Sequence, residues 1–319
     1  MHSTTYSIEE HEAEGLRAWR LHDEASDLYA TWVPPAGMLG ASLVHHGEEL
    51  LWQGPGVAGY ARNGSFMGIP FLYPWANRLA GYRYRAGGHE VELDPGSALL
   101  KLDPNRLPIH GLLTASSRWS TDEAAADGDG ARLLASLEFD DPGLLSAFPF
   151  PHRIEMEVTV SAGTLGVTTT VVGTGSEPVP VAFGFHPYLQ IPSAPRSEWE
   201  VSFPVRRKLM LDDRMIPTGE TKPVEPITGP IGDRIWDDGF DRVDTPAHFV
   251  VSGPGQTIQV EFGAGYPVAQ IYAPPGEQYI CIEPMTARTN ALARSDGELT
   301  WVQPGERWSA VFRIVSTIG

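Results

Sequence analysis

Cysteine is almost absent from this 319-residue sequence, in which Cys281 is the only one. A single cysteine excludes an intramolecular disulfide and favours a reducing compartment, so we expect a cytoplasmic protein. The N-terminal segment MHSTTYSIEEHEAEG lacks the apolar stretch that a secretory signal would need. Cysteine and histidine show no zinc-ligand spacing, and the adjacent His45 and His46 stand in a turn-like segment typical of solvated side chains. We therefore expect no metal site.

Long uninterrupted segments are also missing. The sequence has 34 Gly and 28 Pro, and the longest run free of both is residues 16–33. Both residues are costly inside helices, so this distribution excludes a long-helix bundle or coiled coil. No stretch of about 18 or more apolar residues is present, which excludes a helical membrane span.

Positive charge is in deficit. Lys and Arg total 23 against 40 Asp and Glu, which gives a net charge of −17. Binding to nucleic acid or to an anionic membrane needs a positive surface, so neither is expected as a partner. The balance suits an enzyme that acts on neutral or cationic small molecules, and phosphorylated substrates are disfavoured rather than excluded.

The residues that are present favour a turn-rich β protein. Hydrophobic residues make up 42% of the chain, enough for a sizeable core. Residues 154–160 and 165–171 alternate apolar and polar side chains around the turn 161–164, which predicts a β-hairpin. Residues 121–130 are small and acidic and are predicted to be an exposed hairpin tip or loop, whereas residues 16–33 fit either a helix or strands. Further strand signals lie at residues 41–44, 49–52, 257–262, 268–272, 279–282 and 308–315.

Four segments combine polar side chains with a rigid backbone. The first, Gly68–Arg85, surrounds Asn77 and Arg78 with aromatic residues and two prolines, so the guanidinium can present a planar fork to hydroxyl groups. The second is LPIHGLL, in which His110 lies between an apolar run and a glycine. Taken alone, Arg78 and His110 could each equally be residues with a purely structural role.

The other two segments carry the groups that acid–base catalysis needs. His186 in VAFGFHPYLQIP precedes a proline that keeps its backbone extended, and histidine titrates near neutrality. Glu283 in QYICIEPMTA ends an apolar strand, so partial desolvation should raise the pKa of its carboxyl group. A core histidine and a strand-end glutamate remain the alternative interpretations of these two residues.

In this order the four segments resemble the aldose 1-epimerase (galactose mutarotase) family, in a divergent bacterial branch. PWANRLAG is similar to that family's Asn-Arg motif, IHGLL to its His-Gly motif, and FGFHPYLQIP and CIEPMTA to its catalytic histidine and glutamate segments. DDGFDRV places Asp241 in a context similar to that of the family's sugar-binding Asp, and VAQIYAP places Gln270 where the family has a sugar-facing Gln. The resemblance runs from about Gly37 to the C-terminus.

This resemblance implies a fold and a reaction. The fold is a large twisted antiparallel β-sandwich, a galactose mutarotase-like supersandwich, with few short helices in one domain over residues 1–319. Residues 1–10 are then a candidate flexible end. The reaction is interconversion of the α and β anomers of a free aldohexose through the open-chain aldehyde, by a monomer or homodimer. No cofactor or metal is expected, because the reaction has no redox or hydride step.

The resemblance also implies roles for individual residues. Glu283 would be the catalytic base and His186 the catalytic acid. The implied substrate-binding residues act on the C1 and ring-oxygen region, on the sugar hydroxyls, or as stacking surfaces: Arg78, His110, Asp241, Gln270, Asn77, Trp75 and Tyr188.

Two alternatives stay open at this point. Pro-Tyr-Leu follows His186 where galactose mutarotases often have a Thr-Tyr-Phe-Asn type run, which leaves the preferred sugar open. A hexose-6-phosphate 1-epimerase would use basic residues such as Arg62, Arg83 and Arg85 for phosphate, although the ANR sequence favours neutral sugars. A non-catalytic carbohydrate-binding protein on the same fold is the second alternative, and the retained Glu283 and His186 argue against it.

Overall fold

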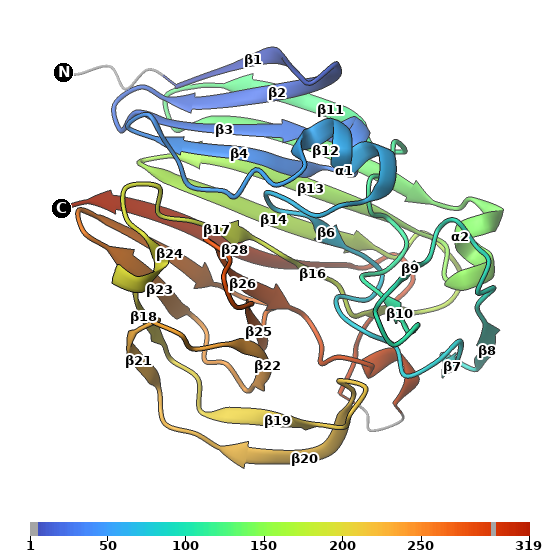
Figure 1. The fold of residues 1–319 in the computed structure, drawn as a ribbon. Coiled ribbons are helices and arrows are strands. Elements are labelled where there is room, and N and C mark those ends of the chain that lie inside the picture. The colour runs from blue at the N-terminus through green and yellow to red at the C-terminus, as the bar shows by residue number, and fades with distance from the viewer. Residues whose placement is uncertain (1–5, 295–297) are drawn as a thin grey trace.

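Strands dominate the computed structural model, which describes residues 6–294 and 298–319. Strand makes up 52% of it and helix 7%, in several antiparallel sheets, so the predicted all-β class is confirmed. Three large sheets make up the fold: in Figure 1 the five-stranded sheet from the N-terminal quarter lies at the top, the eight-stranded sheet lies lower down, and the nine-stranded sheet runs past both. Residues 6–10 were expected to belong to a flexible end, but they form part of strand β1 and pair with β2. Residues 1–5 lie outside the described residues.

The nine-stranded sheet buries one face against the other two large sheets and turns the other face, with Arg307 and Arg313, to the solvent. The predicted hairpin is confirmed in it, because Val158 pairs with Val167 and the odd-numbered side chains from 165 to 171 are buried. Residues 121–126, predicted as a loop, instead form most of an edge strand, and only residues 127–130 make the turn. The strands, in spatial order, are β11 (Ser120–Ala126), β12 (Ala131–Phe139), β13 (His152–Ser161), β14 (Thr164–Val172), β28 (Arg307–Ile318), β24 (Gln256–Phe262), β23 (Ala247–Gly253), β18 (Glu200–Phe203) and β21 (Ile227–Pro230).

The five-stranded sheet packs on the nine-stranded sheet through contacts of β2 and β3 with β12 and β13. Residues 16–33, which the sequence left open, form the hairpin β2–β3, with Leu21 opposite Ala30. Both of these side chains are fully buried, so the apolar residues of this segment lie on one face of paired strands and not on one face of a helix. The strands are β1 (Tyr6–Ala13), β2 (Leu16–Asp23), β3 (Leu28–Val33), β4 (Leu39–His45) and β5 (Glu48–Glu49).

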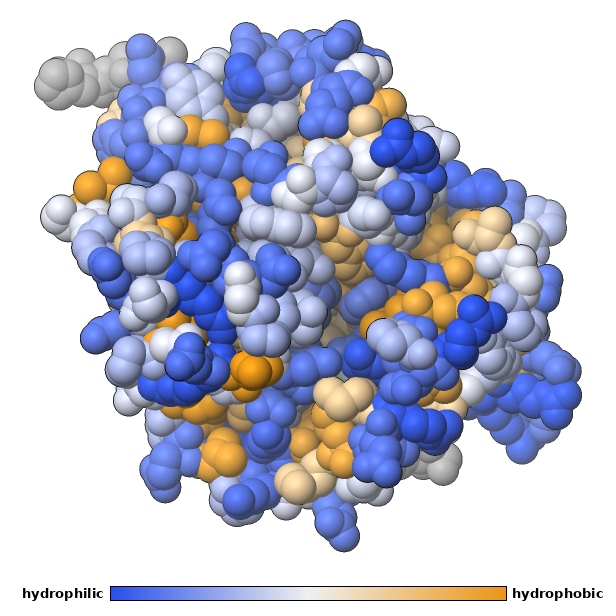
Figure 2. Space-filling model, in the orientation of Figure 1, coloured by the Kyte–Doolittle hydropathy of each residue, from blue (hydrophilic) through white to orange (hydrophobic). Residues whose placement is uncertain are grey.

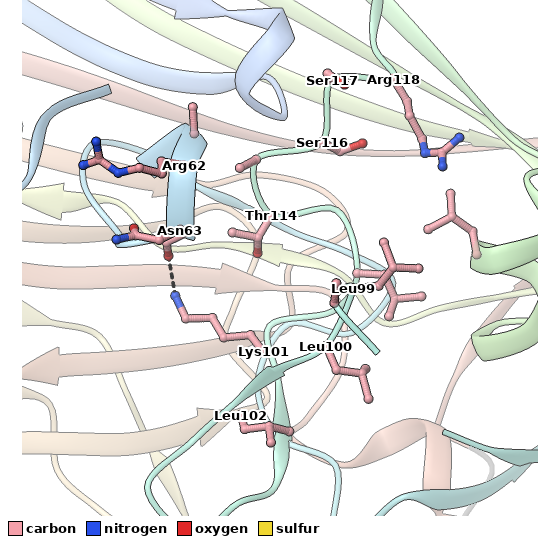
Figure 3. Close-up of a pocket in the computed structure, with 16 residues that line it drawn as sticks. Arg62, Asn63, Leu99, Leu100, Lys101, Leu102, Thr114, Ser116, Ser117 and Arg118 are labelled. Carbon is pink, nitrogen blue, oxygen red and sulfur yellow. Dashed lines mark hydrogen bonds between the residues drawn. The ribbon is translucent and has the colours of Figure 1, made fainter. Parts of the chain in front are cut away.

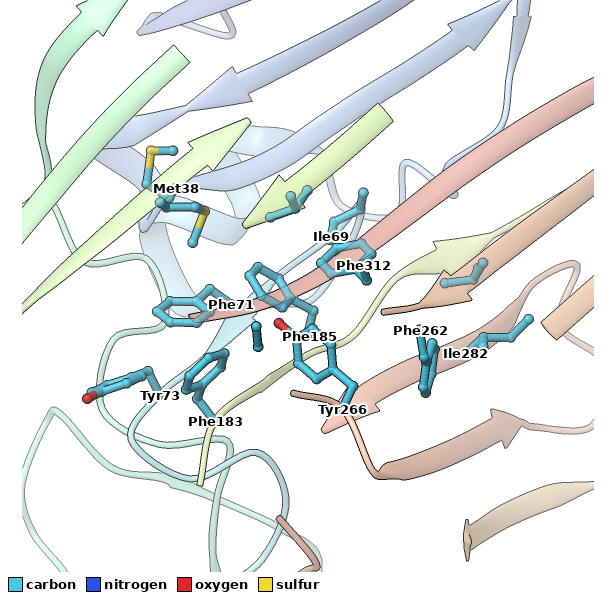
Figure 4. Close-up of a cluster of buried hydrophobic side chains, with 14 of the residues drawn as sticks. Met38, Ile69, Phe71, Tyr73, Phe183, Phe185, Phe262, Tyr266, Ile282 and Phe312 are labelled. Atoms are coloured by element: carbon cyan, nitrogen blue, oxygen red, sulfur yellow. The ribbon is translucent and has the colours of Figure 1, made fainter. Parts of the chain in front are cut away.

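The eight-stranded sheet covers the other part of the core and carries most of the polar segments singled out above. Large aromatic side chains fill the space between it and the nine-stranded sheet (Figure 4). Phe185 and Phe312, one from each sheet, lie with ring centroids 4.9 Å apart. The strands are β20 (Pro217–Pro223), β19 (Arg207–Leu211), β22 (Trp236–Asp241), β25 (Val268–Ala273), β26 (Ile280–Met285), β16 (Gly184–Phe185) and β6 (Phe71–Leu72), with β17 (Tyr188–Leu189) also paired to β26.

Short elements complete the fold. They are the paired strands β7 (Arg83–Ala86) and β8 (His89–Glu92), β9 (Lys101–Leu102) and β10 (Pro108–Ile109), and β15 (Val179–Val181) and β27 (Thr300–Val302), with helices α1 (Gly56–Asn63) and α2 (Pro142–Ala147) and 3₁₀ turns η1 (Pro34–Ala36), η2 (Arg196–Glu198) and η3 (Ala291–Ala293). No helix in the described ranges is long and apolar enough to cross a membrane. Figure 2 shows one face of the molecule as mainly hydrophilic, with apolar residues scattered across it.

Candidate active site

A cleft of about 490 Å³ opens beside the eight-stranded sheet and brings together segments far apart in the sequence. Its walls come from β16–β17, β22, β25 and β26 and from the loops that precede β7 and surround β9 and β10. Six of the nine predicted site residues line it: Asn77, Arg78, His110, His186, Tyr188 and Glu283. The other three, Trp75, Asp241 and Gln270, do not.

Glu283 and His186 face each other in this cleft. The strand that carries Glu283 does not end there, as the sequence suggested, but continues through Pro284 to Met285, so the carboxyl group is held mid-strand. His186 Nε2 lies 3.3 Å from Glu283 Oε1, and the two residues are 5% and 1% exposed. The second carboxyl oxygen, Oε2, is buried without a hydrogen-bond partner. The hydrogen-bonding capacity of this oxygen is therefore unused within the protein.

Burial sets the protonation of the pair. Desolvation raises the pKa of Glu283 well above its usual value, and Asp237 adds to this while Arg78 opposes it. Desolvation likewise lowers the pKa of His186 well below 6.5, with further lowering from His110 and Lys101. Both shifts disfavour two separate charges, so the pair favours holding one proton between its two members. A pair that shares one proton can donate and accept in turn.

His110 reaches the cleft through an unusual backbone. It has φ of +66°, and Gly111 after it has φ of +75°. A Cβ atom on Gly111 would lie 2.0 Å from the carbonyl oxygen of Tyr73, so only glycine fits there. His110 Nδ1 donates to the carbonyl oxygen of Ala76 over 2.9 Å, and burial lowers the pKa of the ring to about 3. A neutral ring with its proton on Nδ1 leaves Nε2 as a hydrogen-bond acceptor.

Arg78 is held rigidly at the opposite wall. Its Nε donates to Asp103 Oδ2 over 2.8 Å, and its Nη1 donates to Asn77 Oδ1 over 3.1 Å. Asp103 is itself fixed, because its Oδ1 accepts the backbone N–H of Leu107. With two donors fixed by the protein, the remaining guanidinium edge points towards Asp237, whose Oδ2 lies 3.7 Å from Nη2.

Asp237, rather than Asp241, supplies the second carboxylate of the cleft. Both residues lie on β22, but four residues of strand separate them by about 13 Å. Asp241, predicted to bind the sugar, does not line this cleft but is buried against Arg207 and Arg288 in a different pocket. Gln270 lies behind the cleft, where its Nε2 donates to Asp237 Oδ1 over 2.7 Å and fixes that carboxylate.

Comparison with known proteins identifies the family of the chain. The sequence profile of the family described as aldose 1-epimerase matches residues 39–315, most of the chain. The chain belongs to the aldose 1-epimerase family. It is also 24% identical over 254 residues to the uncharacterized protein YihR of Escherichia coli K12, which covers 76% of this chain and 77% of that protein.

Solved structures show the same aldose 1-epimerase fold. A galactose mutarotase-like protein from Clostridium acetobutylicum superposes with a TM-score of 0.83 at 21% identity, covering 98% of this chain and 99% of that one. Galactose 1-epimerase from Lactobacillus acidophilus superposes with a TM-score of 0.77 at 15% identity, covering 99% and 100%. At such low identity the likeness establishes the fold, and the predicted supersandwich is confirmed.

Aromatic side chains of this aldose 1-epimerase chain line the cleft, but Trp75 is not among them. Trp75, predicted as a stacking surface, is 3% exposed and belongs to the main hydrophobic core instead of the cleft lining. The aromatic side chains that line the cleft are those of Trp52, Phe66, Tyr188, Tyr272 and Tyr279. Tyr188 also stacks on His186, with ring centroids 4.6 Å apart and planes at 11°, which fixes the imidazole.

Sequence reasoning missed several residues that line the cleft: Trp52, Phe66, Lys101, Asp237, Tyr272 and Tyr279. Asp237 alone had a visible signal, since it lies in the same DDGFD segment as Asp241. Arg83 and Arg85, considered for phosphate, lie on the β7–β8 hairpin outside the cleft and pair with Glu92 and Glu90. Among residues 6–294 and 298–319, no three His, Cys, Asp or Glu side chains group closely enough to hold a metal ion.

Proposed function

We propose that this member of the aldose 1-epimerase family is a mutarotase, which interconverts the α and β anomers of a free aldohexose by acid–base ring opening. The observation that carries the proposal is the buried Glu283–His186 pair, 3.3 Å apart in a cleft lined with aromatic and hydrogen-bonding groups. The family membership supports an epimerase reaction. The sugar itself and the reaction remain for experiment.

In the first half of the reaction, Glu283 as carboxylate takes the proton from the C1 hydroxyl group. The C1–O1 bond becomes a carbonyl, the C1–O5 bond breaks, and its electron pair goes to the ring oxygen. His186 as imidazolium gives its proton to that oxygen. The carboxylate–imidazolium pair has the same proton count as the neutral pair, so the cleft needs no net proton uptake.

In the second half, rotation about C1–C2 turns the other face of the aldehyde towards the C5 hydroxyl group. His186, now neutral, takes the proton from this hydroxyl as its oxygen attacks C1. Glu283 returns its proton to the carbonyl oxygen, which becomes the C1 hydroxyl of the other anomer. Both residues regain their starting state, and the reaction consumes no co-reactant.

The surrounding polar groups fit distinct tasks. Arg78 has a fixed guanidinium and can donate to an oxygen on which negative charge develops. His110 accepts through Nε2 and therefore suits a sugar hydroxyl group rather than the ring oxygen. This leaves proton donation to the ring oxygen to His186. Asp237 accepts from further hydroxyl groups, with Gln270 behind it.

Polarimetry on freshly dissolved α-glucose and α-galactose tests the proposal. Glu283→Gln and His186→Ala should each lower kcat by at least ~100-fold while circular dichroism shows a folded protein. Glu220→Gln and His248→Ala, two exposed residues outside the cleft, are matched controls and should retain wild-type rates. Wild-type rates equal to buffer across a panel of neutral sugars would refute the proposed reaction.

The two alternatives receive less support from this cleft. A hexose-6-phosphate 1-epimerase would need cations for phosphate. Arg83 and Arg85 lie outside the cleft with carboxylate partners, and the two cations in the cleft, Arg78 and Lys101, already contact Asp103 and the carbonyl oxygen of Gly64. A non-catalytic sugar-binding protein would not need a desolvated acid–base pair. Sugar binding without anomerisation by the wild type would establish that alternative.

Other expectations remain part of the proposal. We expect the enzyme in the cytoplasm, on the grounds of its single cysteine, and we expect it to act without cofactor or metal. Its partner is the sugar, with neither nucleic acid nor membrane involved, and it is expected to act as a monomer or homodimer.

A further inference from the structure

Lys101 is a cleft residue without a place in the mechanism above. The chain has only three lysines, Lys101, Lys208 and Lys222. Lys101 lies on the short strand β9, where it pairs with Ile109 of β10. Ile109 is the residue directly before His110. Burial lowers the pKa of its ammonium group to about 8. A desolvated lysine beside two cleft histidines needs a reason for its position.

The contacts of Lys101 all lead to one loop. Its Nζ donates to the carbonyl oxygen of Gly64 over 2.6 Å and lies 3.6 Å from the ring centroid of Phe66. Gly64 is the residue at which helix α1 ends, with φ of +67°. Within the described part of the chain, no carboxylate forms an ion pair with this ammonium group. Lys101 is therefore bound by a carbonyl oxygen and an aromatic face.

Phe66 connects this lysine to the catalytic histidines. Its ring centroid lies 4.9 Å from that of His110 and 5.6 Å from that of His186. It also meets Tyr188 edge-on at 6.4 Å. Phe66 thus forms one wall of the cleft, and its loop is tied to β9 through Lys101.

A larger cavity, of about 770 Å³, lies on the other side of this contact. Figure 3 shows Lys101 reaching across from β9 towards the end of α1, with Thr114 and Ser116 on the neighbouring loop. Lys101 lines both this cavity and the cleft. The side chain of Lys101 and the Gly64–Phe66 loop therefore separate the solvent in the larger cavity from the histidines in the cleft.

We propose that Lys101 is a positioning residue, which holds Phe66 against His110 and His186 and closes the cleft towards the neighbouring cavity. The effect that we expect Lys101 to have on the reaction rate rests on the proposed epimerase reaction. The effect that we expect it to have on the pKa of the histidines does not. Lys101 acts through Phe66 and through its charge, and it neither gives nor takes a proton in the reaction.

Two physical effects follow for the histidines. The Phe66 wall keeps water from both rings, and this desolvation lowers the pKa of each; the positive charge of Lys101 lowers both further. Several charged or titratable groups from the packed elements face the two rings: Arg78, Lys101, Asp103, Tyr188, Asp237, Tyr272 and Glu283. Removing Lys101 removes a cation from this set and loosens the wall, and both changes raise the pKa of the histidines.

Kinetics of Lys101→Met give the first test. We expect kcat to fall by roughly 10- to 100-fold, because the reacting groups lose their fixed positions. The acid limb of the kcat/KM profile should move to higher pH by roughly one unit. Lys101→Arg keeps a cation over Phe66 and should retain the wild-type acid limb. Lys222→Met, at an exposed lysine, is the matched control and should change neither quantity.

Three results would overturn the inference. One is a Lys101→Met enzyme with kcat within twofold of wild type and an unmoved acid limb. Another is an equally lowered kcat in Lys101→Met and Lys101→Arg with no shift of the pH profile in either variant. That result would mean that the lysine has only a structural role. The last is a change confined to KM for acidic sugars, which would make Lys101 a substrate ligand.

A titration of the histidine ring protons by NMR separates this inference from the proposed function. We expect the resonances of His110 and His186, assigned with His110→Asn and His186→Asn, to titrate at higher pH in Lys101→Met than in wild type. Exposed His248 should not move. Unchanged titrations would reject the role of Lys101 even if sugars are anomerised. A wild type that anomerises no sugar would reject the proposed function, while the titrations still test Lys101.

Discussion

At the scale of single residues, the proposed catalytic pair of Glu283 and His186 owes its properties to burial. Glu283 lies in mid-strand with one carboxyl oxygen unpartnered, and His186 is stacked under Tyr188. Neither has a strong counter-ion, since Arg78 is already occupied by Asp103. Desolvation moves the pKa of the two groups in opposite directions, which favours one shared proton.

This predicts a bell-shaped dependence of kcat/KM on pH. Activity falls on the acid side when the pair takes up a second proton, and the lowered pKa of His186 places this limb below pH 6.5. Activity falls on the alkaline side when the pair loses its shared proton. This limb lies well above the usual pKa of a glutamate, because burial raises the pKa of Glu283. Polarimetric rates across the pH range measure both limbs. An acid limb above pH 6.5 would mean that His186 is solvated.

The two aspartates of β22 should respond differently to substitution. Asp237→Asn should lower kcat/KM by roughly 10-fold or more with little change in stability, because Asp237 is a partly exposed cleft group. Asp241→Asn should leave kcat near wild type but cost about 3 kcal/mol of folding free energy, because Arg207 and Arg288 lose a buried partner. Steady-state kinetics and urea unfolding measure the two effects. The reverse assignment would restore Asp241 as the sugar ligand.

At the scale of elements, periodicity in the sequence predicted the strands well where one face is buried. The β13–β14 hairpin is of this kind. Residues 121–126 were misread as a loop, because the small acidic residues of an edge strand carry no apolar face. Asp237 could not be separated from Asp241, since that choice depends on which end of β22 meets the cleft. Local sequence does not encode that packing.

The His110–Gly111 turn offers a test at this scale. Gly111→Ala should destabilise the protein by more than ~2 kcal/mol and lower kcat, because its Cβ would meet the Tyr73 carbonyl oxygen and displace His110. Gly47→Ala is the matched control. Gly47 also has positive φ, at +79°, but its Cβ would meet nothing within 4 Å, so only the backbone cost of about 1–2 kcal/mol applies. Thermal unfolding and kinetics of the two variants make the comparison, and equal losses would contradict it.

At the scale of the whole molecule, the cleft is assembled by topology. Motifs from residues 77–78, 110, 186–188 and 283 meet because two sheets and several loops close around them. Their order in the sequence was enough to predict the family, and six of the nine residues proposed for the site line this cleft. The sequence could not show that Trp75 is buried in the core, or that Lys101 lies between the cleft and a second cavity. Both positions depend on tertiary packing.

Building a desolvated carboxyl group into this fold should lower its stability near neutral pH. The pKa of Glu283 is raised in the folded state, so its contribution to stability is full below about pH 4.5 and is lost as pH rises through the folded pKa. Glu283→Gln should therefore be more stable than wild type at neutral pH, by roughly 1 kcal/mol, with the difference vanishing in acid. Tm measured against pH tests this, with Glu220→Gln as the control. A destabilised Glu283→Gln protein at neutral pH would count against the burial argument.

The most direct test of the central claim is two-dimensional exchange NMR of the anomers of glucose and galactose in D₂O with catalytic amounts of enzyme. The acid–base ring opening at Glu283 and His186 predicts exchange between α and β resonances faster than in buffer, with no deuterium entering at C2. Glu283→Gln should return the exchange rate to that of buffer. Exchange no faster than buffer for any sugar tried, or deuterium at C2, would contradict the account.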